Sequence, residues 1–367
     1  MMVMGQNKSH APSATDTREN RVSKGVNVRR LSIAFFVMAA LVFVVGTTGC
    51  GTSAQSAGLS PADQSPQSIL AKAMEASQSI TSASGSYEIE MSFDVDSSKL
   101  PEEAKGLVAE PMKASGTMVF GQDPQVVEFT LNANMAGQTT NLGMKLGGSK
   151  AWLEYMDQWY EAPPEMQQML AAPAGQEAKA NEIQQLLSEL AVDPATWMKD
   201  VRLVGEEKIG GTDVYHLAAT PDVTKMMADL QKLMQSDKLM KIVDPSGSAG
   251  ELVGSTASLP TAEDLQGMQT QLQAMFKELT ADLWIAKDTS YIVKFAANAT
   301  ITPPPGEDAA GLNAITLTAG VSLQDVNEPV SVEPPASAKP WSAFEQTMKD
   351  NPGMFMGPLL GAGLGAQ

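Results

Sequence analysis

One stretch of strict alternation between apolar and polar residues limits the fold more than any other feature of the sequence. From Tyr87 to Val95 the odd-numbered residues are apolar and the even-numbered ones are polar or acidic. Successive side chains of a β-strand point to opposite faces, so this pattern predicts a strand with one apolar and one wetted face. Such strands are typical of an antiparallel sheet that is covered on one side only.

Similar patterns divide the rest of the chain into groups of strands and groups of helices. Alternation and turn residues predict strands at 114–120, 125–133, 139–146, 151–156, 201–209, 213–219, 281–286, 291–301 and 315–326, with a short one at 330–332. Helical spacing predicts helices at 68–80, 163–170, 181–190, 226–234 and 261–279, and a helix-prone insert at 97–113. Asp193-Pro194 and Thr220-Pro221 are typical helix starts.

This segregated order argues against a doubly wound α/β fold, in which strands and helices alternate. It favours an α+β fold: a single strongly curved antiparallel β-sheet (half-barrel) with helices packed across its concave apolar face.

The first fifty residues predict export and lipidation. An uncharged run from Leu31 to Val45 follows a basic segment and precedes Gly46–Gly49 and Cys50, the only cysteine. At about 1.5 Å per residue the run spans roughly 22 Å as a helix, less than the ~30 Å hydrocarbon core of a bilayer. The pattern is typical of a lipoprotein signal peptide that is cut after Gly49, with a diacylglyceryl group on Cys50.

Thr47 departs from the usual lipobox, where leucine stands in its place. Two alternatives are therefore an uncleaved anchor helix and an ordinary signal peptide with Cys50 as a buried thiol. Arg29-Arg30 raises the question of twin-arginine export, but Ser32 interrupts the apolar positions that should follow. General secretion is the favoured route.

Charge excludes one class of partner. Residues 1–49 hold six basic and two acidic residues, so the rest of the chain keeps 19 of 25 basic and 40 of 42 acidic residues, a net charge of −21. Such a surface repels nucleic acid and anionic lipid headgroups. The membrane is therefore expected as a partner only through the lipid anchor on Cys50, which places the protein outside the cytoplasm, attached to the cell membrane.

The sequence offers little for catalysis. After cleavage His216 is the only histidine, and it lies in a strand-like run where a structural role is favoured. Histidine clusters for zinc and Cys–His pairs are thereby excluded. We find no Gly-rich phosphate loop, calcium loop or nucleophile elbow. No enzyme activity, metal or cofactor is expected.

Three segments resemble the LppX/LprG-type lipoproteins of actinobacteria, and more broadly the LolA-like fold. They are residues 210–217 (GGTDVYHL), 282–289 (DLWIAKDT) and 323–335 (LQDVNEPVSVEPP). The resemblance covers roughly residues 67–340. It implies a half-barrel that encloses an apolar cavity and carries acylated lipids or glycolipids, with an envelope transporter as a further partner. The loop at 244–260 and the insert at 97–113 depart from the family, so ligand identity does not transfer.

We therefore expect a signal peptide at 1–49, a flexible tether at 50–66, the half-barrel domain at 67–340 and a mobile C-terminal tail at 341–367. The expected function is binding or carrying a lipid or glycolipid in a cavity between the sheet and the helices. Methionine, which adapts to irregular apolar guests, is frequent in the predicted inward stripes. The candidate lining residues are Ile89, Met91, Phe93, Met118, Phe120, Phe129, Leu131, Leu142, Met144, Trp152, Met226, Leu230, Met268 and Leu272. The alternative is an envelope interaction or structural lipoprotein with a solid core and no lipid ligand.

Overall fold

The computed structural model describes residues 65–100, 102–122, 125–135, 138–170, 176–236, 238–239, 275–303 and 311–350. The predicted signal peptide, Cys50, the loop at 244–260 and the tail after residue 350 lie outside these ranges. Of the predicted tether, only Ser65 and Pro66 are described.

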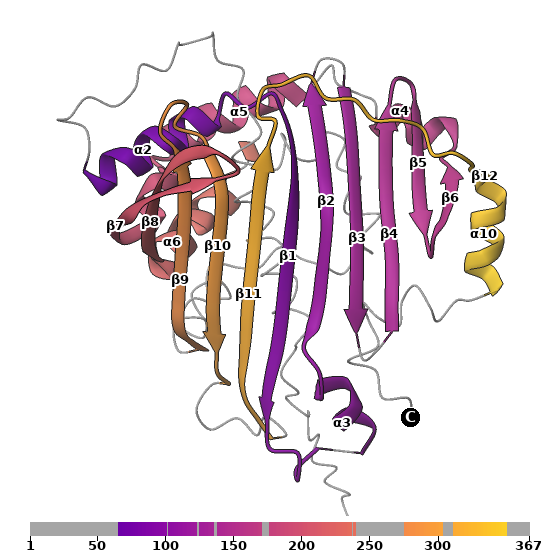
Figure 1. Ribbon diagram of the computed structural model, residues 1–367, viewed down its shortest axis with the longest axis horizontal. Coiled ribbons are helices and arrows are strands. Elements are labelled where there is room, and N and C mark those ends of the chain that lie inside the picture. Colours follow the sequence, from indigo (N-terminus) through magenta and orange to yellow (C-terminus); the bar gives the residue numbers. More distant parts are fainter. Residues whose placement is uncertain are drawn as a thin grey trace, which may run out of the picture.

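The described strands form one twelve-stranded sheet in the order β12-β6-β5-β4-β3-β2-β1-β11-β10-β9-β8-β7. They are β1 (Ser82–Val95), β2 (Met112–Gln122), β3 (Gln125–Met135), β4 (Gln138–Gly147), β5 (Lys150–Tyr155), β6 (Gln158–Glu161), β7 (Met198–Ile209), β8 (Thr212–Pro221), β9 (Phe276–Ala286), β10 (Ile292–Ile301), β11 (Leu312–Gln324) and β12 (Lys339–Pro340). Every pairing is antiparallel except the short parallel one between β12 and β6. The sheet is not closed, since β12 and β7 lie at opposite edges (Figure 1).

Helices cover one face of this sheet, which we call the inner face. The described helices are α2 (Pro66–Ser77), α3 (Glu102–Val108), α4 (Pro164–Leu170), α5 (Gln176–Glu189), the 3-10 helix η3 (Pro194–Trp197), α6 (Val223–Met234) and α10 (Trp341–Asp350). The predicted α+β fold class, a curved open antiparallel sheet with helices on its apolar face, is confirmed.

Three apolar clusters hold helices against the two ends of the inner face. At the β7–β10 end, Ile69 and Ala73 of α2 are buried against Leu217 and Leu283. At the β4–β6 end, Phe344 of α10 is buried with Tyr155 and Tyr160, and Met166 of α4 packs against Leu146 and Ala151. The strands between these ends, with β1 in the centre, lie between the two groups of helices.

The structure corrects three predicted elements. Phe276 and Leu279, assigned to the helix at 261–279, belong to β9 and pair with Ile301 and Ala299, because cross-strand pairing outweighs their helical spacing. Residues 261–274 lie outside the described residues.

The helix predicted to start at Thr220-Pro221 begins later. Pro221 ends β8, and Asp222 caps α6 by accepting a hydrogen bond from the Lys225 N–H at 3.0 Å. Residues 330–332 form no strand.

Residues 325–338 form a strap that runs along one end of the sheet from β11 toward β12 (Figure 1). The side chain of Asn327 fixes its start: its Oδ1 accepts from the Thr81 N–H at 2.7 Å and its Nδ2 donates to the Tyr291 hydroxyl at 2.8 Å. Farther along, the Lys145 Nζ donates to the Glu333 carbonyl oxygen at 3.3 Å. The strap thus ties β1, β10 and β4 together.

A buried carboxylate fixes α6 next to η3. Asp229 is fully buried, and it accepts hydrogen bonds from the Trp197 indole N–H at 2.9 Å and from the ammonium groups of Lys232, at 2.8 Å, and Lys225. Burial acts to raise the pKa of Asp229, but these hydrogen bonds outweigh it and hold the pKa below its ordinary value. The ionised form is therefore the one that stabilises the fold.

We expect Asp229→Asn to lower the free energy of unfolding by about 1–3 kcal/mol at pH 7, because the charge-assisted hydrogen bonds to Lys225 and Lys232 are weakened. A carboxyl group with a lowered pKa stabilises the folded state above its unfolded pKa of ~3.9, and this contribution is lost as pH falls through the folded value. Urea unfolding at pH 7 and pH 3 measures both effects. The exposed Asp200→Asn is the control, expected within about 0.5 kcal/mol of wild type. A difference between Asp229→Asn and wild type that stays constant with pH would contradict this account.

Candidate functional site

The strand register places nine of the fourteen candidate lining residues on the inner face. Met118 pairs with Phe129 and Phe129 with Met144, while Leu131 pairs with Leu142. Tyr87 lies on the same face, and we call these nine residues and Tyr87 the apolar strip: Tyr87, Ile89, Met91, Phe93, Met118, Phe120, Phe129, Leu131, Leu142 and Met144. Most of them are half-buried; Met118 is buried, and Phe129 keeps 37% of its surface exposed. The strip thus offers apolar surface that the protein's own side chains cover only in part.

Of the five remaining candidates, Trp152 is the one that the register places away from the strip. Trp152 is buried, but it pairs with Lys145 and Glu161, which places it on the opposite, outer face of the sheet. A shift of one residue in a strand reverses the face, and the assignment of Trp152 to the inner face is corrected for that reason. Of α6, Met226 is half-buried, and the side chain of Leu230 lies outside the described residues, as do Met268 and Leu272. The strip proper therefore contains nine of the predicted residues together with Tyr87.

Tyr87 organises the middle of the strip by lying across a neighbouring strand. Its hydroxyl donates to the Thr130 carbonyl oxygen of β3 at 2.6 Å, and its ring stacks on Phe129 with centroids 5.3 Å apart. This reach depends on Gly116 of β2, where an added Cβ would lie 1.8 Å from the Thr130 oxygen and 2.6 Å from the Tyr87 hydroxyl. Burial raises the pKa of Tyr87 to about 12, so the hydroxyl remains a donor at any physiological pH.

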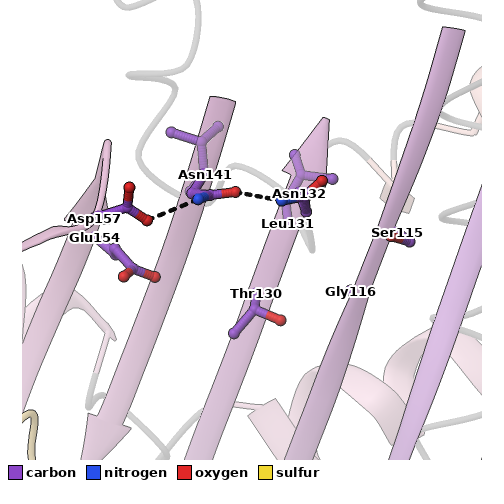
Figure 2. A pocket seen from close by; sticks show the side chains of 9 residues that line it. Ser115, Gly116, Thr130, Leu131, Asn132, Asn141, Glu154 and Asp157 are labelled. Carbon is purple, nitrogen blue, oxygen red and sulfur yellow. Dashed lines mark hydrogen bonds between the residues drawn. The ribbon is translucent and has the colours of Figure 1, made fainter. Parts of the chain in front are cut away.

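One hollow among the described residues lies on the outer face, and most of the residues that line it have polar side chains. It is a shallow pocket of about 230 Å³ between β2 and the β5–β6 turn. Ser115, Gly116, Thr130, Leu131, Asn132, Asn141, Leu142, Glu154 and Asp157 line it (Figure 2). The polar side chains of this pocket were not singled out from the sequence, where outward-facing Asn, Thr and Asp residues look like ordinary solvated surface. The predicted apolar cavity remains a prediction.

His216 lies in β8 within a network on the outer face. Its Nδ1 is 2.7 Å from a Glu207 carboxylate oxygen, and its Nε2 is 2.9 Å from Asp282. The ring stacks on Trp284 at 4.5 Å, and the Trp284 indole N–H donates to Glu207. The hydrogen bonds from His216 and Trp284 lower the pKa of Glu207. These contacts link β7, β8 and β9 side by side, which is a structural use of the histidine.

Within the described ranges, no group of three or more His, Cys, Asp or Glu side chains is placed to hold a metal ion. None of the helices in the same ranges combines the length and the apolar character needed to cross a bilayer.

Comparison with known proteins gives one family model and several solved structures. The model of a family of unknown function (DUF6612) matches residues 65–196, which is well under half of the chain. No curated protein matches the sequence. The chain is similar to the lipoprotein LppX of Mycobacterium tuberculosis at 13% identity and a TM-score of 0.31, over 73% of this chain and 98% of that one.

Two further solved structures are similar to the chain. LprF of Mycobacterium bovis has 13% identity and a TM-score of 0.30, over 77% of this chain and 100% of that one. A DUF1329 family protein of Desulfovibrio piger has 10% identity and a TM-score of 0.20, over 74% and 95%. LppX and LprF are of the LppX/LprG type that the sequence resembles. The fold class itself is established by the strand order and register of this chain.

We expect Gly116→Ala to lower the free energy of unfolding by about 1–3 kcal/mol, because the added methyl group displaces Tyr87 or the Thr130 backbone. The near-ultraviolet circular dichroism of the stacked Tyr87–Phe129 pair should also weaken. Gly320→Ala is the matched control in the same sheet, since its Cβ would meet nothing closer than 3.7 Å. Equal stability of the two variants would show that Tyr87 does not depend on Gly116.

Proposed function

We propose that the protein is an extracytoplasmic lipoprotein that binds the acyl chains of a lipid or glycolipid along the apolar strip. The observation that carries this proposal is the strip itself. Nine predicted residues and Tyr87 share one face of a curved sheet, between helices packed at its two ends. A large apolar surface rimmed by other elements is typical of a binding site.

The energetics favour an aliphatic ligand. Each CH₂ group removed from water contributes about 0.8 kcal/mol, so an acyl chain gains binding free energy along its whole length without any polar contact. Met91 and Met144 have unbranched side chains that adapt to a flexible chain, whereas Phe129 supplies a fixed aromatic wall. No covalent step is part of this function, and no enzyme activity or cofactor is proposed.

The proposal assigns separate roles to two lipids. A diacylglyceryl group on Cys50 holds the protein on the membrane, since the acidic remainder of the chain is repelled by anionic headgroups. Residues 50–66 form a tether, residues 67–340 the binding domain and residues 341–367 a tail whose first part, α10, packs on β5 and β6. A second lipid on the apolar strip is cargo, which an envelope transporter would supply or receive.

Native mass spectrometry tests the cargo. Protein extracted gently from its host membrane should appear with an additional non-covalent mass in the range of a lipid, which collisional activation removes. A clean mass of the protein and its anchor alone would contradict the proposal. That result would favour the alternative, an envelope interaction or structural lipoprotein with a solid core and no ligand.

A charged substitution on the strip tests the location of the cargo. Phe129→Asp should abolish most of the bound lipid, because a carboxylate on the strip must be desolvated when an acyl chain covers it. Val204→Asp is the control, since Val204 lies in the edge strand β7, distant from the strip, and is 53% exposed. The amount of co-purified lipid per protein, measured after solvent extraction, should fall in the first variant and stay unchanged in the second. Equal retention by both would place the lipid elsewhere.

Removal of the thiol tests the anchor. Cys50→Ser should shift the protein from the membrane fraction to the soluble fraction after cell lysis and should remove the acyl mass from the N-terminal peptide. A variant that stays in the membrane fraction would instead favour the uncleaved anchor helix.

A further inference from the structure

The outer face of the sheet carries a row of hydrogen-bonded polar side chains that the lipid-binding proposal does not use. The Nδ2 of Asn132 donates to the Oδ1 of Asn141 at 2.6 Å, and the Nδ2 of Asn141 donates to the Asp157 carboxylate at 2.7 Å. These three residues come from β3, β4 and the β5–β6 turn, and Figure 2 shows them in line across the strands. Each amide is thereby held in one orientation before any ligand arrives.

This row forms one side of the pocket of about 230 Å³, whose other polar walls are Ser115, Thr130 and Glu154. The Glu154 side chain occupies the space above Gly143. A Cβ added to Gly143 would lie 2.7 Å from a carboxylate oxygen of Glu154. Trp159 reaches the same glycine, with a ring carbon 3.0 Å from that position. Glu154 thus forms a polar wall of the pocket, and Trp159 lies beside Glu154 without lining the pocket itself.

The turn that delivers Asp157 is conformationally demanding. Met156 and Asp157 have φ values of 50° and 63°, the left-handed region that a two-residue hairpin turn requires. Glycine and asparagine adopt this region most easily, and other residues meet a steric cost. The strained turn nonetheless holds the Asp157 carboxylate at the end of the amide row.

The two acidic side chains that line the pocket, Glu154 and Asp157, disfavour anions. None of its nine described lining residues is a lysine or an arginine. Burial, together with the negative charges of Asp157 and Glu128, raises the pKa of Glu154 against the opposing effect of Lys145.

We propose that this pocket binds a single uncharged saccharide ring. Each hydroxyl group of a sugar is both a donor and an acceptor, and the free lone pairs and N–H groups of the amide row alternate in the same way. The volume lies below the roughly 300–1,000 Å³ of sites for drug-sized ligands, which limits the pocket to about one ring.

A cation is the competing occupant, and the geometry disfavours it. Calcium requires six to eight converging oxygen atoms. Here the Nδ2 groups of Asn132 and Asn141 point along the row, and the described residues provide no group of three acidic, histidine or cysteine ligands. The saccharide site lies on the face opposite to the apolar strip, so saccharide binding does not depend on lipid binding.

Saturation-transfer NMR of the full-length protein with millimolar methyl glycosides of neutral hexoses and N-acetylated amino sugars tests the proposal. Wild type should show transfer to at least one glycoside. Asn132→Ala and Asn141→Ala should each weaken its binding by about tenfold or more, because each removes hydrogen bonds to the ring and breaks the row. Asn298→Ala is the matched control, since Asn298 is an exposed asparagine on β10 that also accepts a hydrogen bond from a neighbouring strand, from Thr318. Unchanged melting temperatures establish that the variants are folded.

Retained binding in wild type and Asn298→Ala, with loss in both row variants, would support the site. The proposal is overturned by the absence of transfer to every glycoside, by equal transfer in all four proteins, or by calcium shifting the Asn132 and Asn141 side-chain amide resonances while no glycoside does so.

Discussion

The antiparallel pairing of β1 with β11 is the interaction on which the rest of the structure depends. It joins an N-terminal meander, β1 to β6, to a C-terminal group, β7 to β11, and it runs from Ser84↔Gln324 to Val95↔Leu312 with one irregularity near its end. Without it the two groups would each have a long exposed edge. Because side chains alternate between faces in every strand, this one register also decides which residues of both groups share a face.

The consequence of that shared register is a sheet with different chemistry on its two faces. The inner face brings Tyr87, Met91 and Phe129 together between helices packed at both ends. The outer face carries the strap, the His216 network and the amide row. Gly116 connects the two, since its missing side chain lets Tyr87 cross β2 on the inner face while its backbone lines the pocket on the outer face. Lipid binding and saccharide binding are thereby assigned to opposite faces of one sheet.

Period-two alternation predicted the strands of the sheet well, because half-covered strands display their two faces directly in the sequence. Trp152 shows where this reasoning fails: an apolar side chain on the outer face gives no sign in the sequence that the strap passes over that end of the sheet. Phe276 and Leu279 show the reverse error, in which helical spacing continued into residues whose partners, Ile301 and Ala299, are distant in sequence. The amide row was missed because Asn132, Asn141 and Asp157 become a site only when three elements align them.

The account's central claim is that acyl chains lie on the inner face, against β1, β3 and β4. Photo-crosslinking with a phospholipid that carries a diazirine in its acyl chain, followed by peptide mapping of the full-length protein, measures this directly. The account predicts label within residues 87–93 and 129–131, and competition by unlabelled lipid. Label confined to outer-face residues, or distributed without preference over both faces, would contradict it.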